Sequence, residues 1–397
     1  MRVLHVSKLY PPFIGGVETA VQRLAEGLRD ANRGIEPEVL CCQPKGPEVL
    51  ERVNGIPVRR VSSLGMGWGM PLSPAMALQW RRLTREYDLI HLHVPFPLAN
   101  LGEVLHREGP PVVVHYHSQI VRQRLLAPLY RPVDARVLRR AKRIIVGSPN
   151  MLEVPELAPV KDKCRVIPYP HVPGPPVQAA TQARLTARLN LGGGPLVLYV
   201  GRLGYYKGLP YLIEAMLDVE AKLVIAGDGP LRKELEEQVT RAGLTHKIQF
   251  IGAVTDEEKE CLYGMATVFV LPSILPSEAF GLVQVEAMAH GVPVVNTALA
   301  SGVPWVSPHG ETGLTVPPRE SSALSKALNR IVFNPAERER FANGAGLRAK
   351  TFSRDQIIRA LIDEYQAILA ESRIGSQSLP PHPVEKPQKK PIQLQKE

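Results

Sequence analysis

The stretch Ser277–Gly291, SEAFGLVQVEAMAHG, contains two carboxylates, Glu278 and Glu286, with seven residues between them. The apolar residues between them predict a helix over Gly281–His290, with Glu278 in the preceding loop. Unpaired backbone N–H groups at a helix start attract anions. The pattern therefore suits a ligand with a diphosphate in its middle and hydroxyl groups at both ends, such as a nucleotide sugar. The alternative is a capped helix with two solvated glutamates, because helix starts favour acidic residues.

The length and composition are those of a soluble globular protein with two or more domains. The 397 residues are 44% hydrophobic and 22% charged, and no apolar run is long enough to predict a membrane-spanning helix. The N-terminus, MRVLHVSKLYPP, is too short and too polar for a secretory signal and predicts a strand. The four cysteines form no C-x-x-C pair, which favours a reducing, cytoplasmic compartment. The net charge of +10 indicates acidic partners: nucleotide, nucleic acid or anionic lipid.

Short apolar runs alternate with helix-like segments along both halves of the chain. This alternation predicts an α/β fold with two Rossmann-like, doubly wound parallel sheets, whose carboxyl ends face a cleft where ligands bind. We expect an N-terminal domain over residues 1–175, a linker over 176–194, a C-terminal domain over 195–352, a closing helix over 353–371 and a disordered tail over 372–397. The expected strands are Val3–Ser7, Pro37–Cys42, Ile56–Val61, Leu89–His93, Val112–His115, Ile144–Val146, Leu196–Val200, Lys222–Ala226, Ile248–Ile251, Val268–Leu271 and Val292–Val295.

Two loops that follow predicted strands carry residues suited to phosphate. Gly15 and Gly16 lie between the first strand and the first helix, where a backbone without side chains approaches a phosphate or sugar closely. Arg202 and Lys207 follow the strand Leu196–Val200, and two cations on one loop suit a diphosphate. Taken singly, the glycines also fit a plain tight turn and the cations also fit solvated surface charges.

Together these motifs resemble the retaining glycosyltransferases of family 4. The resemblance covers residues 1 to about 371 and implies the GT-B architecture of twin Rossmann-like domains. The motif set is far more specific than any one of its members. In chain order the motifs are Gly15-Gly16-Val17-Glu18, Gly201-Arg202-Leu203 with Lys207-Gly208, Ala226-Gly227-Asp228-Gly229-Pro230, and Glu278-x7-Glu286.

The resemblance implies a role for each motif. Arg202 and Lys207 would hold the diphosphate of the donor, and Gly16 would back it from the other domain. Glu286 would bind the ribose, and Glu278 would lie beside the donor sugar. Backbone groups at the start of the helix would contact the phosphates and the sugar, namely those of Phe280, Gly281, Leu282 and Val283.

Histidines lie at the ends of two predicted strands of the first domain. His91 and His93 end one strand, His115 and His117 end another, and strand alternation places each pair on one face. Four histidines are conceivable as a metal site, but the carboxylates that such sites favour are not evident, so no metal is expected. In the resembled family a histidine after this strand lies near the anomeric carbon and the donor phosphate. His117 matches that position best and joins Glu278, Arg202 and Lys207 as an expected catalytic residue.

The chemistry implied by the resemblance is transfer of a sugar from a nucleotide diphosphate with retention of configuration. Arg202, Lys207 and the helix start at Gly281 would stabilise the charge that builds up on the leaving phosphate. The sequence contains no D-x-D motif, and two cations can replace a divalent metal, so we expect no metal and no other cofactor. Retention usually involves a carboxylate nucleophile. No convincing nucleophile stands out, so the resemblance implies a same-face displacement through an oxocarbenium-like state.

A basic region points to the acceptor side. Large apolar side chains accompany the basic ones, and Asp134 is the one acid among residues 122–143. Such a region suggests an anionic membrane surface or lipid carrier at the inner face of the membrane, and the alternative is a solvated basic helix packed by its apolar face. The basic residues are Arg122, Arg124, Arg131, Arg136, Arg139, Arg140, Lys142 and Arg143.

The donor and acceptor follow from a narrower resemblance. The run Ser301–Val316 is similar to bacterial mannosyltransferases that build polysaccharide on polyprenyl diphosphates, which implies GDP-mannose as donor and a lipid-linked or growing glycan as acceptor. One alternative is a UDP-sugar-dependent enzyme of the same fold. Another is a degenerate, non-catalytic scaffold protein, against which the complete motif set argues. Nucleic-acid binding would also explain the charge, but no RRM, KH or zinc-finger pattern is present.

Overall fold

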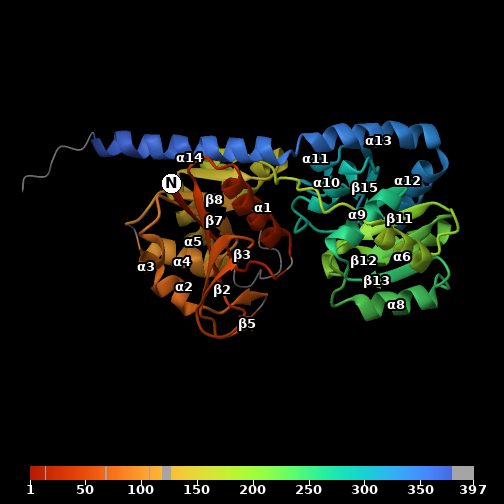
Figure 1. Cartoon of the computed structure of the whole chain (residues 1–397), viewed down its shortest axis with the longest axis horizontal. Coiled ribbons are helices and arrows are strands. Elements are labelled where there is room, and N and C mark those ends of the chain that lie inside the picture. The colour runs from red at the N-terminus through yellow and green to blue at the C-terminus, as the bar shows by residue number, and fades with distance from the viewer. Residues whose placement is uncertain (14, 68, 107, 119–126, 378–397) are drawn as a thin grey trace, which may run out of the picture.

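The computed structural model describes residues 1–377 except residues 14, 68, 107 and 119–126. These residues form two α/β units that lie side by side along the long axis of the molecule (Figure 1). The predicted tail from residue 378 onward, Gln119, Arg122 and Arg124 lie outside the described residues. Each unit is built on one large sheet, so the predicted fold class is confirmed.

The first sheet has eight strands among the described residues, and all neighbours pair in parallel except β3 with β4. Successive side chains point to opposite faces, so Val3 packs with the helices Gly16–Asp30 and Arg354–Gln377, and Leu4 packs with the helices between Pro74 and Arg140. The sheet is thus covered on both faces, as a doubly wound sheet requires. In spatial order its strands are β10 (Cys164–Val166), β9 (Arg143–Val146), β8 (Val112–Tyr116), β7 (Leu89–Val94), β1 (Arg2–Val6), β2 (Glu36–Cys42), β4 (Ile56–Val61) and β3 (Val49–Val53).

The second sheet has six strands in the described part of the chain, all parallel. Four predicted strands have the bounds expected from the sequence, namely Ile56–Val61 of the first sheet and Leu196–Val200, Lys222–Ala226 and Val268–Leu271 of the second. The apolar side chains of this sheet fill two cores, one on each face. In spatial order the strands are β13 (Ile248–Gly252), β12 (Lys222–Ala226), β11 (Leu196–Val200), β14 (Val268–Leu271), β15 (Val294–Thr297) and β16 (Gly313–Val316). A separate small ribbon pairs β5 (Met66–Gly67) with β6 (Met70–Pro71).

Helices connect the strands in both units (Figure 1). In the first unit they are α1 (Gly16–Asp30), α2 (Pro74–Leu78), α3 (Trp80–Thr84), α4 (Pro97–Leu105), α5 (Ala127–Arg140) and the 3₁₀ segments η1 (Pro149–Glu153) and η2 (Pro155–Lys163). In the second they are α6 (Ala179–Leu189), η3 (Tyr205–Lys207), α7 (Leu209–Ala215), η4 (Met216–Asp218), α8 (Arg232–Arg241), α9 (Asp256–Met265), α10 (Leu282–Ala289), α11 (Val303–Val306), α12 (Ser321–Phe333) and α13 (Pro335–Lys350). The last helix is α14 (Arg354–Gln377).

The segment expected to be a plain linker, residues 176–194, contains helix α6. Leu185 and Leu189 of this helix are buried in the core shared with α9, and Arg184 pairs with Glu258 at 2.8 Å. The flanking prolines and glycines predicted a linker, but the apolar side chains between them have a helical spacing that a neighbouring helix can bury. The segment is therefore partly a structural element of the second unit.

The C-terminal helix α14 returns to the first unit and lies across it (Figure 1). Gly27 of α1 lets the two helices approach closely, because a Cβ there would lie 2.5 Å from Cδ1 of Ile358. Arg143 fixes the far part of α14 through Glu364 at 3.1 Å and Glu371 at 2.5 Å. The helix ends at Gln377, so the expectation that disorder begins at residue 372 is wrong. No proline precedes Pro380 in this stretch, so nothing in the sequence stops the helix at Glu371.

Candidate functional site

The helix predicted from the opening stretch is α10, and its start is shaped by Gly281. This residue is the N-cap, with φ 74°, a left-handed conformation that favours glycine. A side chain at this position would also meet Leu271, since the Cβ would lie 2.6 Å from its Cδ2. Leu282 and Val283 form the half-buried first turn of the helix. The backbone N–H groups at this end are therefore arranged as an anion site would need.

Lys207 and Glu278 meet at the entrance to this helix. The Nζ of Lys207 donates to Oε2 of Glu278, and the Oγ of Ser273 donates to the same oxygen at 3.1 Å. Lys207 and Glu278 are only 7% and 9% exposed, so water screens their attraction weakly. Burial alone would lower the pKa of Lys207, but the charge of Glu278 outweighs it and holds that pKa above its ordinary value. Two residues expected from the sequence to contact the donor thus lie in direct contact.

Arg202 is placed differently from Lys207. It follows β11 on the same loop, but its side chain is exposed, and no ion pair or hydrogen bond joins its guanidinium to the described residues. Its backbone carbonyl accepts a hydrogen bond from the hydroxyl of Tyr199 at 3.0 Å, which holds the loop. The loop therefore presents one exposed cation and one buried cation.

Glu286 lies on α10 at the boundary between the two units. Its carboxylate accepts from Arg23 of α1 at 2.5 Å, from the hydroxyl of Tyr263 at 3.0 Å, and lies 3.3 Å from the Nζ of Lys259. Burial alone would raise its pKa, but the charges of Arg23 and Lys259 outweigh burial and lower it. No motif in the sequence points to Arg23, Lys259 or Tyr263. Helical periodicity gave the elements on which they lie, but only the tertiary fold brings them to Glu286.

The Gly15–Gly16 pair lies at the start of α1. Gly15 is the N-cap in an extended conformation, and a Cβ there would lie 2.2 Å from Oε2 of Glu18, whose carboxylate bends back over it. A Cβ at Gly16 would meet nothing within 4 Å. Gly16 thus faces open space, as a residue in contact with a ligand would. Gly15 instead leaves room for the side chain of Glu18.

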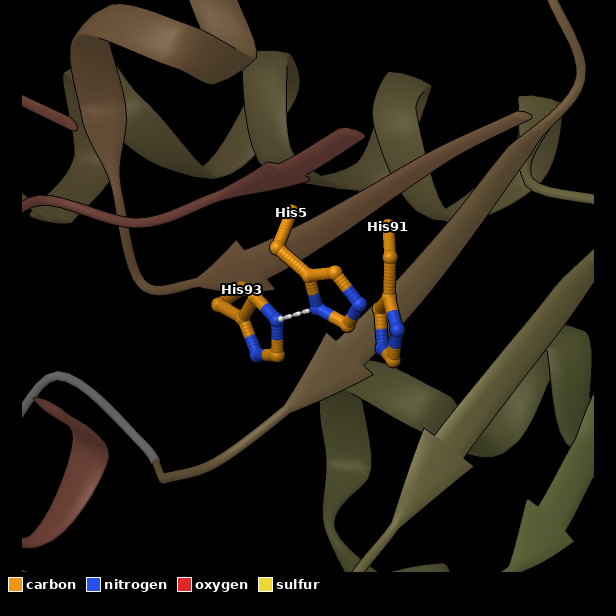
Figure 2. A group of neighbouring side chains, drawn as sticks. All are labelled: His5, His91 and His93. Carbon is orange, nitrogen blue, oxygen red and sulfur yellow. Dashed lines mark hydrogen bonds between the residues drawn. The ribbon is translucent and has the colours of Figure 1, made fainter. Parts of the chain in front are cut away.

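A stack of five buried histidines fills the face of the first sheet below α14. His5 of β1, His91 and His93 of β7, and His115 with His117 at the end of β8 share this face, and Figure 2 shows the first three together. The predicted pairing of His91 with His93 and of His115 with His117 on one face is confirmed. His5 was not anticipated, because its place between the pairs depends on β1 lying beside β7.

His117 is 4% exposed, and both its ring nitrogens have partners within the protein. Its Nε2 lies 2.9 Å from Nδ1 of His93, and its Nδ1 lies 2.7 Å from the hydroxyl of Tyr169. The ring of Tyr169 meets Phe280 of the second unit edge to face, with centroids 4.9 Å apart. His117 is therefore connected to the loop before α10 through Tyr169. Burial lowers the pKa of His117 to about 3.

Two overlapping histidine groups bring ring nitrogens within 4.8 Å of one another, one made of His5, His91 and His93 and one of His93, His115 and His117. A metal bound by imidazole lies in the plane of each ring, along the nitrogen lone pair. His91 and His93 are stacked at 4.4 Å with an interplanar angle of 19°, and His115 and His117 at 4.4 Å with 4°. Two other ring pairs of these groups are instead joined nitrogen to nitrogen, His5 to His93 at 3.0 Å and His93 to His117 at 2.9 Å, so these nitrogens have partners within the protein.

The basic region on α5 is only partly a free surface. Arg143 pairs with Glu364 and Glu371 of α14, and Arg140 lies 3.3 Å from Glu103. Asp134 is half-buried, and the loss of solvent around it raises the pKa of its carboxyl to about 6. The expectation of one basic face is therefore wrong for Arg140 and Arg143, which hold the fold together. Exposed basic side chains remain at Arg131, Arg136, Arg139 and Lys142.

A family model described as glycosyltransferase family 4 matches residues 14–170, and one described as glycosyl transferases group 1 matches residues 183–348. The D-rhamnosyltransferase WbpZ of Pseudomonas aeruginosa is 35% identical over 88% of this chain and 91% of that protein. The O-antigen chain mannosyltransferase C of Escherichia coli is 31% identical over 93% of this chain and 99% of that protein.

Two solved structures superpose on most of this chain. The sucrose-phosphate synthase of Thermosynechococcus elongatus superposes with a TM-score of 0.76 at 26% identity, covering 93% of this chain and 99% of that chain. Anabaena HepE, solved with UDP and glucose, gives a TM-score of 0.75 at 22% identity, covering 92% and 100%, which bears on the fold alone. Among the described residues, no helix is both long and apolar enough to cross a bilayer.

Proposed function

The chain belongs to glycosyltransferase family 4 and has the GT-B fold, and from this premise we propose that it transfers mannose from GDP-mannose to a lipid-linked or growing polysaccharide. The position of the two carboxylates around α10 supports this most. Glu278 lies before the helix with Lys207, and Glu286 lies on the helix with Arg23. The helix start lies between the two carboxylates, as a ligand with a central diphosphate requires.

Each group then has a role. Arg202 and Lys207 hold the diphosphate, together with the backbone of Phe280, Gly281, Leu282 and Val283, and Gly15 and Gly16 back it from the first domain. Glu286 binds the ribose, Glu278 lies beside the sugar, and His117 lies near its anomeric carbon. The bond from the anomeric carbon to the phosphate breaks, the acceptor oxygen bonds to that carbon on the same face, and the leaving phosphate takes the acceptor proton. Electrostatic stabilisation of that phosphate is the main catalytic contribution.

The relatives support mannose as the sugar and offer a second candidate. The E. coli relative is an O-antigen chain mannosyltransferase, and a further relative from Mycolicibacterium smegmatis, 27% identical, is GDP-mannose-dependent. The Pseudomonas relative transfers D-rhamnose, which is 6-deoxymannose. A 6-deoxymannosyl donor is therefore the second candidate, since only the substituent at C6 differs. The UDP complexes of HepE support UDP-sugars less, because their similarity bears on the fold alone.

Donor hydrolysis over a panel of nucleotide sugars tests this function. The panel contains GDP-mannose, GDP-6-deoxymannose, GDP-glucose, UDP-glucose and UDP-galactose, and nucleoside diphosphate release is measured with and without a polyprenyl-diphosphate-linked glycan. We expect release from GDP-mannose to be the fastest. Preference for the 6-deoxy sugar would select the second candidate, and preference for UDP-sugars would overturn the donor. Binding of donors without any turnover would favour a non-catalytic protein.

Activity is expected to be independent of divalent metal and to retain the anomeric configuration. The chain has no D-x-D motif, and Arg202 and Lys207 supply positive charge where a metal would. Initial rates should be unchanged after EDTA treatment and dialysis, and proton NMR of the first product should show the α-anomer from an α-linked donor. A loss of activity that Mg²⁺ or Mn²⁺ restores would contradict metal independence. A β-linked product would contradict retention of the anomeric configuration.

We also propose that the first domain docks on the inner face of the membrane. Arg131, Arg136 and Arg139 on α5 are exposed, and the acid of this helix, Asp134, is half-buried. Each cation near an anionic surface contributes about 1 kcal/mol, and salt screens the attraction. A lipid-linked acceptor would then reach the first domain, opposite the donor held by the second domain.

The change of Arg131, Arg136 and Arg139 to serine should weaken binding to vesicles with anionic lipid by ~10²-fold at low salt, because three such contributions are lost. Arg140 and Arg143 stay unchanged, since their ion pairs hold α4 and α14. The matched control changes three exposed lysines of the second domain, Lys233, Lys326 and Lys350, to serine. Vesicle sedimentation at low and high salt measures both. Equal binding by the two variants would mean that α5 is a solvated helix face.

A further inference from the structure

Three hydrogen bonds join His5, His93, His117 and Tyr169 into one continuous chain. The Nδ1 of His5 lies 3.0 Å from Nε2 of His93, which is the contact drawn in Figure 2. The Nδ1 of His93 lies 2.9 Å from Nε2 of His117, and the Nδ1 of His117 lies 2.7 Å from the Tyr169 hydroxyl. All four side chains are buried, so water does not compete for these bonds.

A chain of neutral imidazoles has a direction. Each neutral ring has one N–H donor and one bare nitrogen acceptor, so a ring that accepts on one side must donate on the other. The protons of His5, His93 and His117 are therefore ordered together, either all donated toward His5 or all donated toward Tyr169. The tautomer of one ring fixes the tautomers of the other two.

The two orders differ in how many buried groups they leave unpaired. If the Tyr169 hydroxyl donates to His117, each ring donates onward through Nε2, and the N–H at Nε2 of His5 is left without a partner among the described residues. In the opposite order Nε2 of His5 is a bare acceptor without a partner, and the Tyr169 hydroxyl proton has no acceptor in the described residues. The first order leaves fewer buried groups unsatisfied, and such groups are costly.

We propose that His5 and His93 are positioning residues that hold His117 as the neutral Nε2–H tautomer, with the bare Nδ1 directed at Tyr169. This inference rests on the function proposed above, in which His117 lies near the donor sugar. Tyr169 contacts Phe280, which precedes the N-cap of α10, so the outer end of the chain lies at the loop expected to hold the donor.

The proposal defines what His117 can bind. A bare Nδ1 accepts a hydrogen bond, so it takes a hydroxyl group and cannot donate to a phosphate oxygen. In the structure the hydroxyl of Tyr169 occupies this position. A hydroxyl of the donor sugar would replace it, which makes His117 a group that recognises the sugar rather than the diphosphate.

Nitrogen-15 NMR tests the tautomer in the full chain without any substrate. Histidine ring nitrogens are labelled, and long-range proton–nitrogen correlations at pH 7.5 distinguish Nε2–H from Nδ1–H rings. Signals are assigned with His93→Phe and His117→Ala. We expect His93 and His117 to be Nε2–H tautomers in slow exchange. Nδ1–H tautomers or averaged signals would overturn the proposal.

Kinetics test the positioning role. In His93→Phe the Nε2–H of His117 loses its acceptor, so we expect kcat to fall about 10-fold while the affinity for free GDP, measured by calorimetry, stays within twofold of the wild type. His93→Asn should recover part of the rate, because its amide oxygen can accept near the position of Nδ1. The matched control is His91→Phe, on the same strand and equally buried but bonded to Tyr365 instead of His117, which should leave kcat within twofold.

Three outcomes distinguish the positioning role from the alternatives. Equal losses of kcat in His91→Phe and His93→Phe would mean that the stack acts by packing alone, which overturns the positioning role. A His117→Ala variant that loses affinity for free GDP as strongly as for GDP-mannose would place His117 at the phosphates and overturn it too. If the wild type turned over no nucleotide sugar, the proposed function would fail, and the NMR tautomers would still decide the order of the chain.

Discussion

Arg202→Ala and Lys207→Ala are each expected to lower turnover by ~10²-fold or more, the usual effect of losing an electrostatic contact in the transition state. Both cations lie on the loop after β11, and Lys207 contacts Glu278 in the segment before α10, where charge would build up on the leaving phosphate. Steady-state kinetics with GDP-mannose measure the effect. Near-wild-type turnover in both variants would remove the diphosphate assignment.

The two variants should differ in stability, which separates chemistry from folding. Arg202 is exposed, so its removal should leave Tm unchanged. Lys207 is the buried partner of Glu278, and removing one partner of a buried ion pair costs about 3–5 kcal/mol. The double variant Lys207→Met with Glu278→Gln should recover most of that stability without recovering activity. Lys233→Ala, at an exposed cation of α8, is the matched control for Arg202→Ala.

The sequence predicted strands well where apolar runs are buried on both faces. β11 and β14 have the expected bounds because their residues are apolar throughout and lie inside the second sheet. β3 was missed because VLERV is an exposed edge strand whose side chains carry no pattern of burial. Helix α6 was missed for a different reason. The turn residues at both of its ends predicted a linker, although the segment between them is amphipathic.

The residues of the candidate site also fall into two groups, those that a local motif identifies and those that only the tertiary fold brings together. Glu278, Glu286 and Lys207 could be predicted because they belong to short motifs whose spacing has a local meaning. Arg23 could not, because it lies 263 residues from Glu286 along the chain and the two meet only when both domains are folded. Tyr169 lies in a loop without a motif of its own. Its importance depends on His117, which is 52 residues away.

Stability is expected to fall steeply as the pH is lowered from about 7.5 to about 5.5. Burial lowers the pKa of His5 and His117 to about 3 and those of His91, His93 and His115 well below their ordinary value. The unfolded chain protonates near pH 6.5, so unfolding takes up protons below that pH and becomes more favourable. An unfolded histidine goes from about one-tenth to about nine-tenths protonated across this window, so each such histidine contributes about 1.4 kcal/mol between pH 7.5 and pH 5.5. Together they amount to several kcal/mol, against a typical stability of about 5–15 kcal/mol.

Two acids oppose this trend, the buried Glu103 and the half-buried Asp134, but the five histidines outnumber them. Burial raises the pKa of Asp134 to about 6 and raises that of Glu103, so both bind a proton more readily in the folded chain and favour it as the pH falls. The net effect of five histidines against two carboxyls remains destabilising. Thermal unfolding followed by circular dichroism should show Tm falling by about 10 °C between pH 7.5 and pH 5.5.

His115→Phe identifies the histidines as the cause. Neither ring nitrogen of His115 has a hydrogen-bond partner among the described residues, so the change removes a titrating group without breaking a bond. Urea unfolding of this variant across the same pH range should give a slope smaller by about 0.7 kcal/mol per pH unit on average, or about 1.4 kcal/mol over the two units. His246→Gln, at an exposed histidine of the second domain, should leave the slope unchanged. A wild-type stability that is flat from pH 7.5 to pH 5.5 would mean that the stack takes up protons without unfolding, and so that water reaches it in the folded state.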